Sequence, residues 1–303
     1  MGLAERAGHM DVSNSVDVTD PVAVCAAVRA ILGQCYPGFD FSAVEHLVAD
    51  LERLYTGNYP GFRACDVDYH DLQHVLDVTL AMARLLDGYE RSVETGLGPE
   101  LALAGIAAAL FHDSGYIRRR RDTRHSNGAA YTRVHVERSA RFLAEYLPGV
   151  GLGDLLGVCS RAVRYTAYDL SGMPFGGESP AEHRLGTLLG TADLIAQLSD
   201  VDYLRKCREH LYSEFEAGGI AGKGVGPGPH GVAYESPDHL LEATPDFIRG
   251  AIRDRLEDRF EGAYRFAAAH FGGENLYMQA IRWNSEKLEV QLARRFACSN
   301  PSA

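Results

Sequence analysis

The sequence lacks any apolar run long enough to cross a membrane. Its longest charge-free apolar stretch near the centre covers only residues 101–111, whereas a membrane helix needs about 20 residues. The first twenty positions hold Glu5, Asp11, Asp17 and Asp20 and no apolar segment typical of a secretory signal. We therefore expect a cytoplasmic protein that has no membrane partner.

Paired cysteines and an excess of basic charge are lacking as well. The six cysteines include no C-x-x-C pair, which is typical of reduced thiols in the cytosol. Lysine and arginine total 30 against 41 aspartates and glutamates, a net charge of −11. This balance argues against an extended nucleic-acid surface, so an anionic ligand needs a local basic site. Because hydrophobic residues make up 46% and charged residues 23%, we expect a folded globular chain.

The pattern of alternating apolar and polar residues that marks β-strands is absent too. From Pro21 onward, apolar residues recur three or four positions apart, which is the spacing of helices with one buried face. Residues 101–111 are apolar on nearly all sides, which predicts a buried central helix. The sequence therefore predicts an all-α helical bundle.

Breaks in this pattern predict how the chain is organised. Seven glycines and three prolines fall between residues 218 and 237, too many for any regular element. Thr244 and Pro245 have the form of an N-terminal cap followed by the first residue of a helix. We expect a flexible leader at 1–18, a single all-α domain at 19–303 with its core at about 65–215, a loop at 218–237, and C-terminal helices at 244–298.

Three short polar motifs interrupt the apolar helices. His74, the pair His112 and Asp113, and Asp193 each lie at or near one end of a predicted helix, where side chains of a bundle converge. Either histidine alone is more often a hydrogen-bonded core residue than a ligand. However, Asp113 directly ends an almost wholly apolar helix, where an unpaired carboxylate is costly to bury. Two imidazoles and two carboxylates suit Mn, Mg, Zn, Fe, Co or Ni, so we predict a site for a divalent metal ion.

At these residues the chain resembles the HD-domain metal-dependent phosphohydrolases, whose motif order is His, then His-Asp, then Asp on a helical bundle. The resemblance covers about residues 65–215 and implies an HD-domain fold with His74, His112, Asp113 and Asp193 as metal ligands. The Tyr-His-x-x-x-His form at 69–74 looks closest to the cyclic nucleotide phosphodiesterase branch. This likeness implies that His70 is the general acid, and it makes His70 and Asp113 the candidate catalytic residues.

The chain departs from the family pattern at several positions. Asp71 stands where asparagine is usual, no histidine follows the His-Asp pair by three or four residues, and Tyr131 replaces an expected acidic residue. His135 is similar to the histidine of the helix that follows the His-Asp motif, and we expect it to contact substrate. These departures leave the ligands of one metal ion in place and remove those expected for a second, which Asp113 and water molecules could still hold.

Five arginines occur within residues 118–124. Guanidinium groups grip phosphate oxygens in pairs, although a solvated basic loop explains most of such a cluster equally well. We expect one or two of them to approach the site, with Arg118 and Arg124 as the candidate substrate-binding residues.

Together these features predict a metal-dependent hydrolase of phosphate esters that activates water for attack on phosphorus. The expected partner is a small-molecule phosphate ester, most plausibly a phosphodiester or a nucleotide, and a homo-oligomer stays open. Two alternatives also remain open at this stage. One is an HD-type di-iron oxygenase, and the other is a regulatory HD domain that binds metal without turnover.

Overall fold

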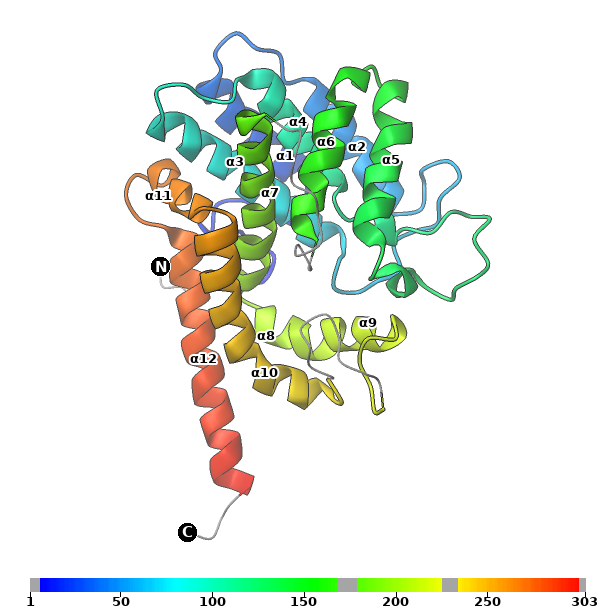
Figure 1. Ribbon diagram of the computed structural model, residues 1–303, viewed down its shortest axis with the longest axis vertical. Helices are drawn as coiled ribbons and strands as arrows, with labels where there is room; N and C mark the ends of the chain where they lie inside the picture. The colour runs from blue at the N-terminus through cyan, green and yellow to red at the C-terminus, as the bar shows by residue number, and fades with distance from the viewer. Residues whose placement is uncertain (1–5, 168–178, 225–233, 300–303) are drawn as a thin grey trace.

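The computed structural model describes residues 6–167, 179–224 and 234–299 (Figure 1). In these ranges the regular elements are helical, and β-type pairing is confined to isolated bridges such as the one between Phe62 and Arg119. The predicted all-α bundle is therefore confirmed for the described residues.

The first part of the chain forms a bundle around long buried helices. Its helices are α1 (Pro21–Cys35), α2 (Ala43–Tyr55), α3 (Leu72–Ser92), α4 (Pro99–Phe111), α5 (His135–Gly149), α6 (Leu156–Val163) and α7 (Pro180–Ser199). Helix α3 packs against α1, α4 and α7, and α7 also packs against α6 and α4. Helix α4 is buried almost throughout because it is apolar apart from Glu100. Side chains from α3, α4 and α7 can therefore meet inside the bundle.

Short helical turns connect these helices near the predicted motifs. They are η2 (Ser114–Tyr116), η3 (Gly128–Tyr131), η4 (Gly153–Leu155) and η5 (Arg164–Thr166). Helix α3 begins after Asp71, whose side chain accepts a hydrogen bond from the His74 N–H at 2.9 Å and so caps the helix. This cap puts His74 in the first turn of α3 and leaves His70 outside the helix.

A second group of helices follows the bundle in the chain. These are α8 (Tyr203–Lys206), η6 (Cys207–Leu211), α9 (Tyr212–Ala217), α10 (Pro237–Gly250), η7 (Ala251–Arg259), η8 (Ala263–Arg265), α11 (Phe266–His270) and α12 (Leu276–Ser299), with η6 and η7 in π-helical form. Figure 1 shows α8, α9 and α10 beneath the bundle, and we call these helices with η6 the lower layer. Helix α11 packs on α3 and α12 on α7.

The start of the C-terminal helices differs from the prediction. Helix α10 begins at Pro237, because the Ser236 hydroxyl accepts a hydrogen bond from the His239 N–H at 3.1 Å and forms the cap. The predicted cap, Thr244, lies inside α10 and donates its hydroxyl to the Leu240 carbonyl at 2.8 Å. Pro245 also lies inside the helix, where it removes one backbone donor. Of the predicted loop, residues 225–233 lie outside the described residues.

Residues 6–18 also differ from the predicted flexible leader, since they pack on the bundle. Asp11 is 1% exposed and forms an ion pair with Arg84 of α3 at 2.6 Å. Three backbone N–H groups in residues 13–16 donate to its carboxylate. A buried charge needs such partners, so Arg84 attaches this segment firmly. Residues 1–5 of the predicted leader lie outside the described residues.

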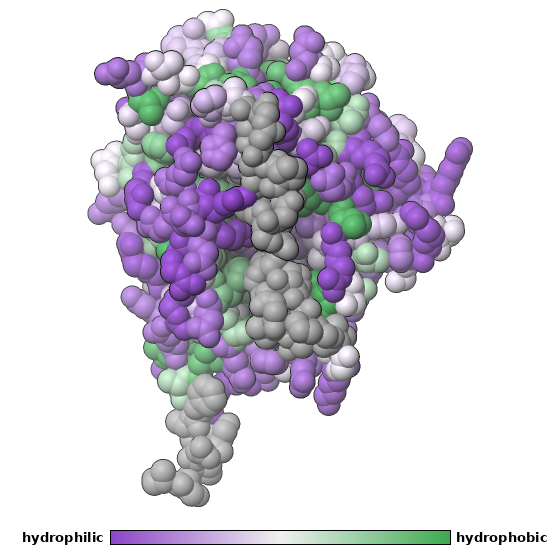
Figure 2. All heavy atoms as spheres, in the orientation of Figure 1, coloured by the Kyte–Doolittle hydropathy of each residue, from purple (hydrophilic) through white to green (hydrophobic). Residues whose placement is uncertain are grey.

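The surface in Figure 2 is mainly hydrophilic. Among the described residues, the exposed large hydrophobic side chains are valines at separate positions in the chain: Val22, Val134, Val150 and Val290. None of the described helices combines the length and apolar character that a bilayer crossing requires.

Candidate metal centre

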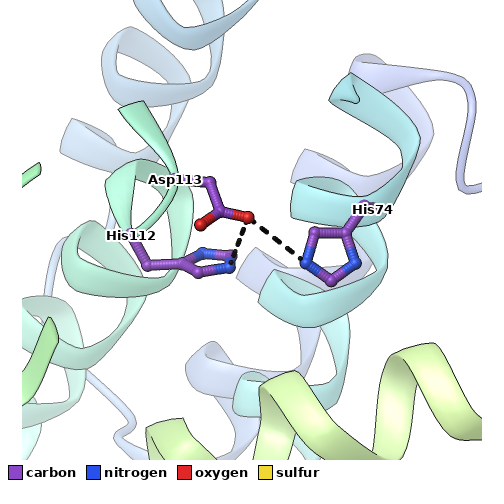
Figure 3. A group of neighbouring side chains, drawn as sticks. All are labelled: His74, His112 and Asp113. Atoms are coloured by element: carbon purple, nitrogen blue, oxygen red, sulfur yellow. Dashed lines mark ion pairs between the residues drawn. The ribbon is translucent and has the colours of Figure 1, made fainter. Parts of the chain in front are cut away.

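Two histidines and one aspartate meet inside the bundle. The His112 Nε2 atom lies 3.2 Å from Asp113 Oδ2, and the His74 Nε2 atom lies 3.4 Å from the same oxygen. Figure 3 shows His74 on α3 facing His112 and Asp113, which follow the end of α4. All three side chains are buried. This buried group could hold a metal ion.

Asp193 of α7 completes the predicted ligand set. Its Oδ1 atom lies 3.4 Å from His74 Nε2 and 3.9 Å from His112 Nε2. Residues 185–196 of α7 are all buried, so Asp193 lies within the interior of the bundle. The structure therefore brings together His74, His112, Asp113 and Asp193, which belong to three segments that are far apart in the sequence.

The donor atoms of this cluster fit a metal ion. The His112 Nδ1 atom is 2.7 Å from the Ala109 carbonyl, which only accepts, so Nδ1 carries the hydrogen and Nε2 is free to bind. Among the described residues, His74 Nε2, His112 Nε2 and Asp113 Oδ2 have no hydrogen-bond partner. Two ligand atoms about 2.1 Å from one ion lie roughly 3.0–3.4 Å apart in octahedral or tetrahedral geometry. The distances to Asp113 Oδ2 match that spacing.

The charges of the cluster attract one another strongly. Burial lowers the pKa of His74, but the nearby carboxylates of Asp113 and Asp193 outweigh this effect and raise it to about 10. Burial raises the pKa of Asp113, and the neighbouring imidazoles outweigh that effect and hold it well below its ordinary value. The two carboxylates thus demand positive charge, which a proton or a divalent cation can supply.

His70 reaches the cluster from the bend before α3. The family resemblance implies that His70 is the general acid, and the structure adds a partner for it. The His70 Nδ1 atom lies 2.5 Å from Glu214 Oε1 of α9, and the other carboxylate oxygen accepts the Tyr69 N–H at 3.3 Å. Burial lowers the pKa of His70, but the charges of Glu214 and Asp113 outweigh it and raise the pKa. Glu214 is 4% exposed, so this pair is buried.

Tyr116 holds two histidines in place. Its ring stacks on His70 with centroids 4.6 Å apart and on His135 with centroids 4.5 Å apart. The His135 Nδ1 atom donates to the Thr132 carbonyl at 2.7 Å, and its Nε2 atom lies 3.6 Å from Asp113 Oδ1. Burial lowers the pKa of His135. His135 therefore presents an unprotonated nitrogen to the cluster.

A glycine allows this close approach of α5. A Cβ atom added at Gly115 would lie 1.9 Å from the His135 carbonyl oxygen, which no side chain can tolerate. The Gly115 N–H also donates to the Ser139 hydroxyl at 2.8 Å. Gly115 thus fixes the start of α5, and with it His135, against turn η2.

A cavity of about 390 Å³ lies beside the cluster. His70, Asp113, His135 and Asp193 face it from the bundle. Its lower wall comes from the lower layer and the segment before α10 and is mostly apolar or aromatic, with Leu211, Phe215, Tyr234, Leu240 and Phe247. His70, Asp113 and Asp193 therefore open onto a space of the size that small-molecule ligands occupy.

The structure does not bring the two predicted arginines to this cavity. Arg118 donates to Asp66 Oδ2 from Nε at 3.1 Å and from Nη2 at 2.5 Å, and to the His125 carbonyl at 2.6 Å. Arg124 is exposed and lies near Asp122 and Tyr131. Neither arginine lines the cavity, because Asp66 from the segment before α3 holds Arg118 and Asp122 of the same loop holds Arg124.

Other residues that the sequence analysis did not identify do line it or support it. Glu214 reaches His70 from α9, and Arg133 and Arg255 supply positive charge to the cavity wall. No local motif marks Glu214 or Arg255, since each meets the site only through tertiary packing.

Comparison with protein-family models and with curated proteins finds no match for this chain.

Proposed function

We propose that this protein is a metal-dependent hydrolase of phosphate esters, with a phosphodiester or a nucleotide as substrate. The observation that carries the proposal is the set of unpartnered donors on His74, His112 and Asp113, with Asp193 beside them, at the edge of a cavity that also holds His70. Ligands of both nitrogen and oxygen type suit Mn²⁺, Mg²⁺, Zn²⁺ or iron. The resemblance to HD-domain phosphohydrolases supports the same reading.

A divalent ion held by these residues would supply Lewis-acid polarisation and would lower the pKa of a water molecule to about 7, which makes hydroxide available for attack on phosphorus. The chain's own residues supply orientation and proton transfer. Asp113 and Asp193 provide negative ligands, and the hydrogen bond to Ala109 fixes His112 so that its Nε2 faces inward. His135 and Asp113 Oδ1 offer two donors for a second ion.

His70 is the general acid in this proposal. Glu214 accepts a hydrogen bond from His70 Nδ1, which favours the doubly protonated ring and leaves the Nε2 hydrogen to donate. The Tyr116 ring and the Tyr69 backbone hold the imidazole and its carboxylate in one orientation. The leaving alkoxide would take the Nε2 proton, a contribution of typically about 10²- to 10⁴-fold.

Metal content tests the first part of this proposal. Protein purified without chelator should hold a divalent metal, and His112→Ala and Asp113→Ala should lose most of it, because each removes a ligand whose neighbours stay in place. His46→Ala is the matched control, since His46 is exposed on α2. Elemental analysis measures the metal in all four proteins. Equal metal content in all of them would overturn the metal site.

Turnover tests the second part. With Mn²⁺ or Mg²⁺ and without oxygen, we expect cleavage of a nitrophenyl phosphodiester or of a nucleotide. Activity that requires iron and consumes O₂ would replace this proposal with an oxygenase. A metal-loaded protein that is inert in both assays would favour the regulatory alternative.

A further inference from the structure

Arg255 places a permanent positive charge in the wall of the cavity. It comes from η7, which packs beside α7, and it lines the same space as His70, Asp113 and Asp193. Leu256 and Phe260, both fully buried, anchor its segment in the protein. The Arg255 guanidinium lies over the Phe260 ring, with its carbon 5.5 Å from the ring centroid. Its position is therefore set by packing rather than by solvent.

The protein itself uses little of the hydrogen-bonding capacity of Arg255. A guanidinium has five N–H donors. Among the described residues, Arg255 donates from Nη2 to the Ala167 carbonyl at 3.2 Å, its buried Nε has no partner, and no carboxylate lies within ion-pair distance. Burial lowers the pKa of Arg255, and the charge of Asp193 acts against this effect. A partly buried cation with spare donors is costly unless an anion meets it.

The apolar side of the cavity points to the rest of the ligand. Phe215 and Tyr234 stack with centroids 6.3 Å apart, and Phe247 lines the space near them. These side chains come from α9, the segment before α10, and α10, so they form a wall made by the lower layer and its connection. Water or sugar hydroxyls against such a wall would gain few hydrogen bonds. An aromatic or aliphatic group would instead remove apolar surface from water.

We infer that Arg255 binds an anionic oxygen of the substrate, and that the substrate is a phosphate ester with an apolar or aromatic body packed against Phe215, Tyr234 and Phe247. This inference rests on the proposed function and narrows it. The cavity of about 390 Å³ has room for a phosphate together with one or two rings. Sugar phosphates and inorganic polyphosphate are poor matches, because they have no apolar group for this wall.

Binding of phosphonates, which resist hydrolysis, tests the inference by calorimetry. Phenylphosphonate and methylphosphonate carry the same anionic group and differ only in the apolar body. We expect the unmodified protein to bind phenylphosphonate at least about 10-fold more tightly, since a phenyl ring buries apolar surface. Arg255→Gln should weaken phenylphosphonate by roughly 10- to 100-fold, in line with loss of a charge-assisted hydrogen bond. Arg253→Gln is the matched control, because Arg253 is an exposed residue of the same helix that pairs with Asp254.

Two further variants separate binding from folding. Arg255→Lys keeps the charge and should recover part of the affinity that Arg255→Gln loses. Phe247→Ala should weaken phenylphosphonate and leave methylphosphonate unchanged. Thermal melting of each variant shows whether it is folded, and Arg255→Lys carries the test if Arg255→Gln does not fold.

The outcomes distinguish this inference from the proposed function. Equal affinity in Arg255→Gln and Arg253→Gln, or equal binding of the two phosphonates by the unmodified protein, overturns the inference even if phosphate esters are hydrolysed. Arg255-dependent binding of phenylphosphonate by a protein that hydrolyses no phosphate ester overturns the proposed function and supports the binding role of Arg255.

Discussion

The hydrogen bond between His70 and Glu214 offers a sharp test of the proposed chemistry. Glu214→Gln keeps the shape of the side chain and can still accept the Tyr69 N–H, but it removes the negative charge 2.5 Å from His70 Nδ1. Without that charge, burial lowers the pKa of His70 and the ring holds its second proton less well. We expect weaker proton donation and an unchanged metal site.

The size of the effect follows from the kind of interaction. A hydrogen bond to a charged group contributes about 1.5–3 kcal/mol, and about 1.4 kcal/mol corresponds to a factor of ten. The variant should therefore lose roughly 10- to 100-fold in kcat on an ester with an alkoxide leaving group. This loss is smaller than the one expected for His70→Ala, because the imidazole itself remains.

The assay compares two leaving groups. A nitrophenolate leaves without a proton, so turnover of a nitrophenyl ester should change little in Glu214→Gln, while turnover of an alkyl ester falls. Glu216→Gln is the control, because Glu216 is an exposed residue of the same helix, and this variant should behave like the unmodified protein on both esters. Equal losses on the two esters in Glu214→Gln, or no loss on either, would refute the role given to this pair.

Three more predictions concern stability and the supporting structure. Burial raises the pKa of Asp11, but Arg84 and hydrogen bonds from residues 13–16 lower it to about 2, so about 2 kcal/mol of stability present above pH 4 should disappear as the pH falls toward 2. Urea unfolding at several pH values measures this loss. Asp11→Asn should be less stable at neutral pH and should not show the loss. If the free energies of unfolding of the two proteins fell in parallel with pH, the role of Asp11 would be wrong. Gly115→Ala should lower the free energy of unfolding by roughly 1–3 kcal/mol and reduce turnover, because the added Cβ displaces the start of α5. Unchanged stability and kcat would show that α5 can shift without cost. Arg118→Gln should lower stability by about 1–3 kcal/mol by leaving Asp66 unpaired while KM stays unchanged, and a raised KM with normal stability would restore Arg118 to the substrate site.

The amino-acid sequence by itself determined the helical class and the order of the candidate metal ligands. Helical periodicity is a local property, so it predicts α3, α4 and α7 without knowledge of their packing. The carboxylate of Asp113 at the end of an apolar helix is also informative, because a buried carboxylate is costly unless a cation or a hydrogen-bond donor meets it. With the motif order that resembles the HD-domain family, these two signals support one hypothesis that includes His74, His112, Asp113 and Asp193.

Only the tertiary structure decided which charged groups work beside them. The sequence favours Arg118 as a substrate-binding residue and gives no signal for Glu214, yet Arg118 pairs with Asp66 away from the cavity and Glu214 meets His70. Asp11 likewise finds Arg84 only through packing of residues 6–18 on α3. Pairings of this kind depend on how helices are placed against one another, and side-chain spacing along the chain does not encode that placement.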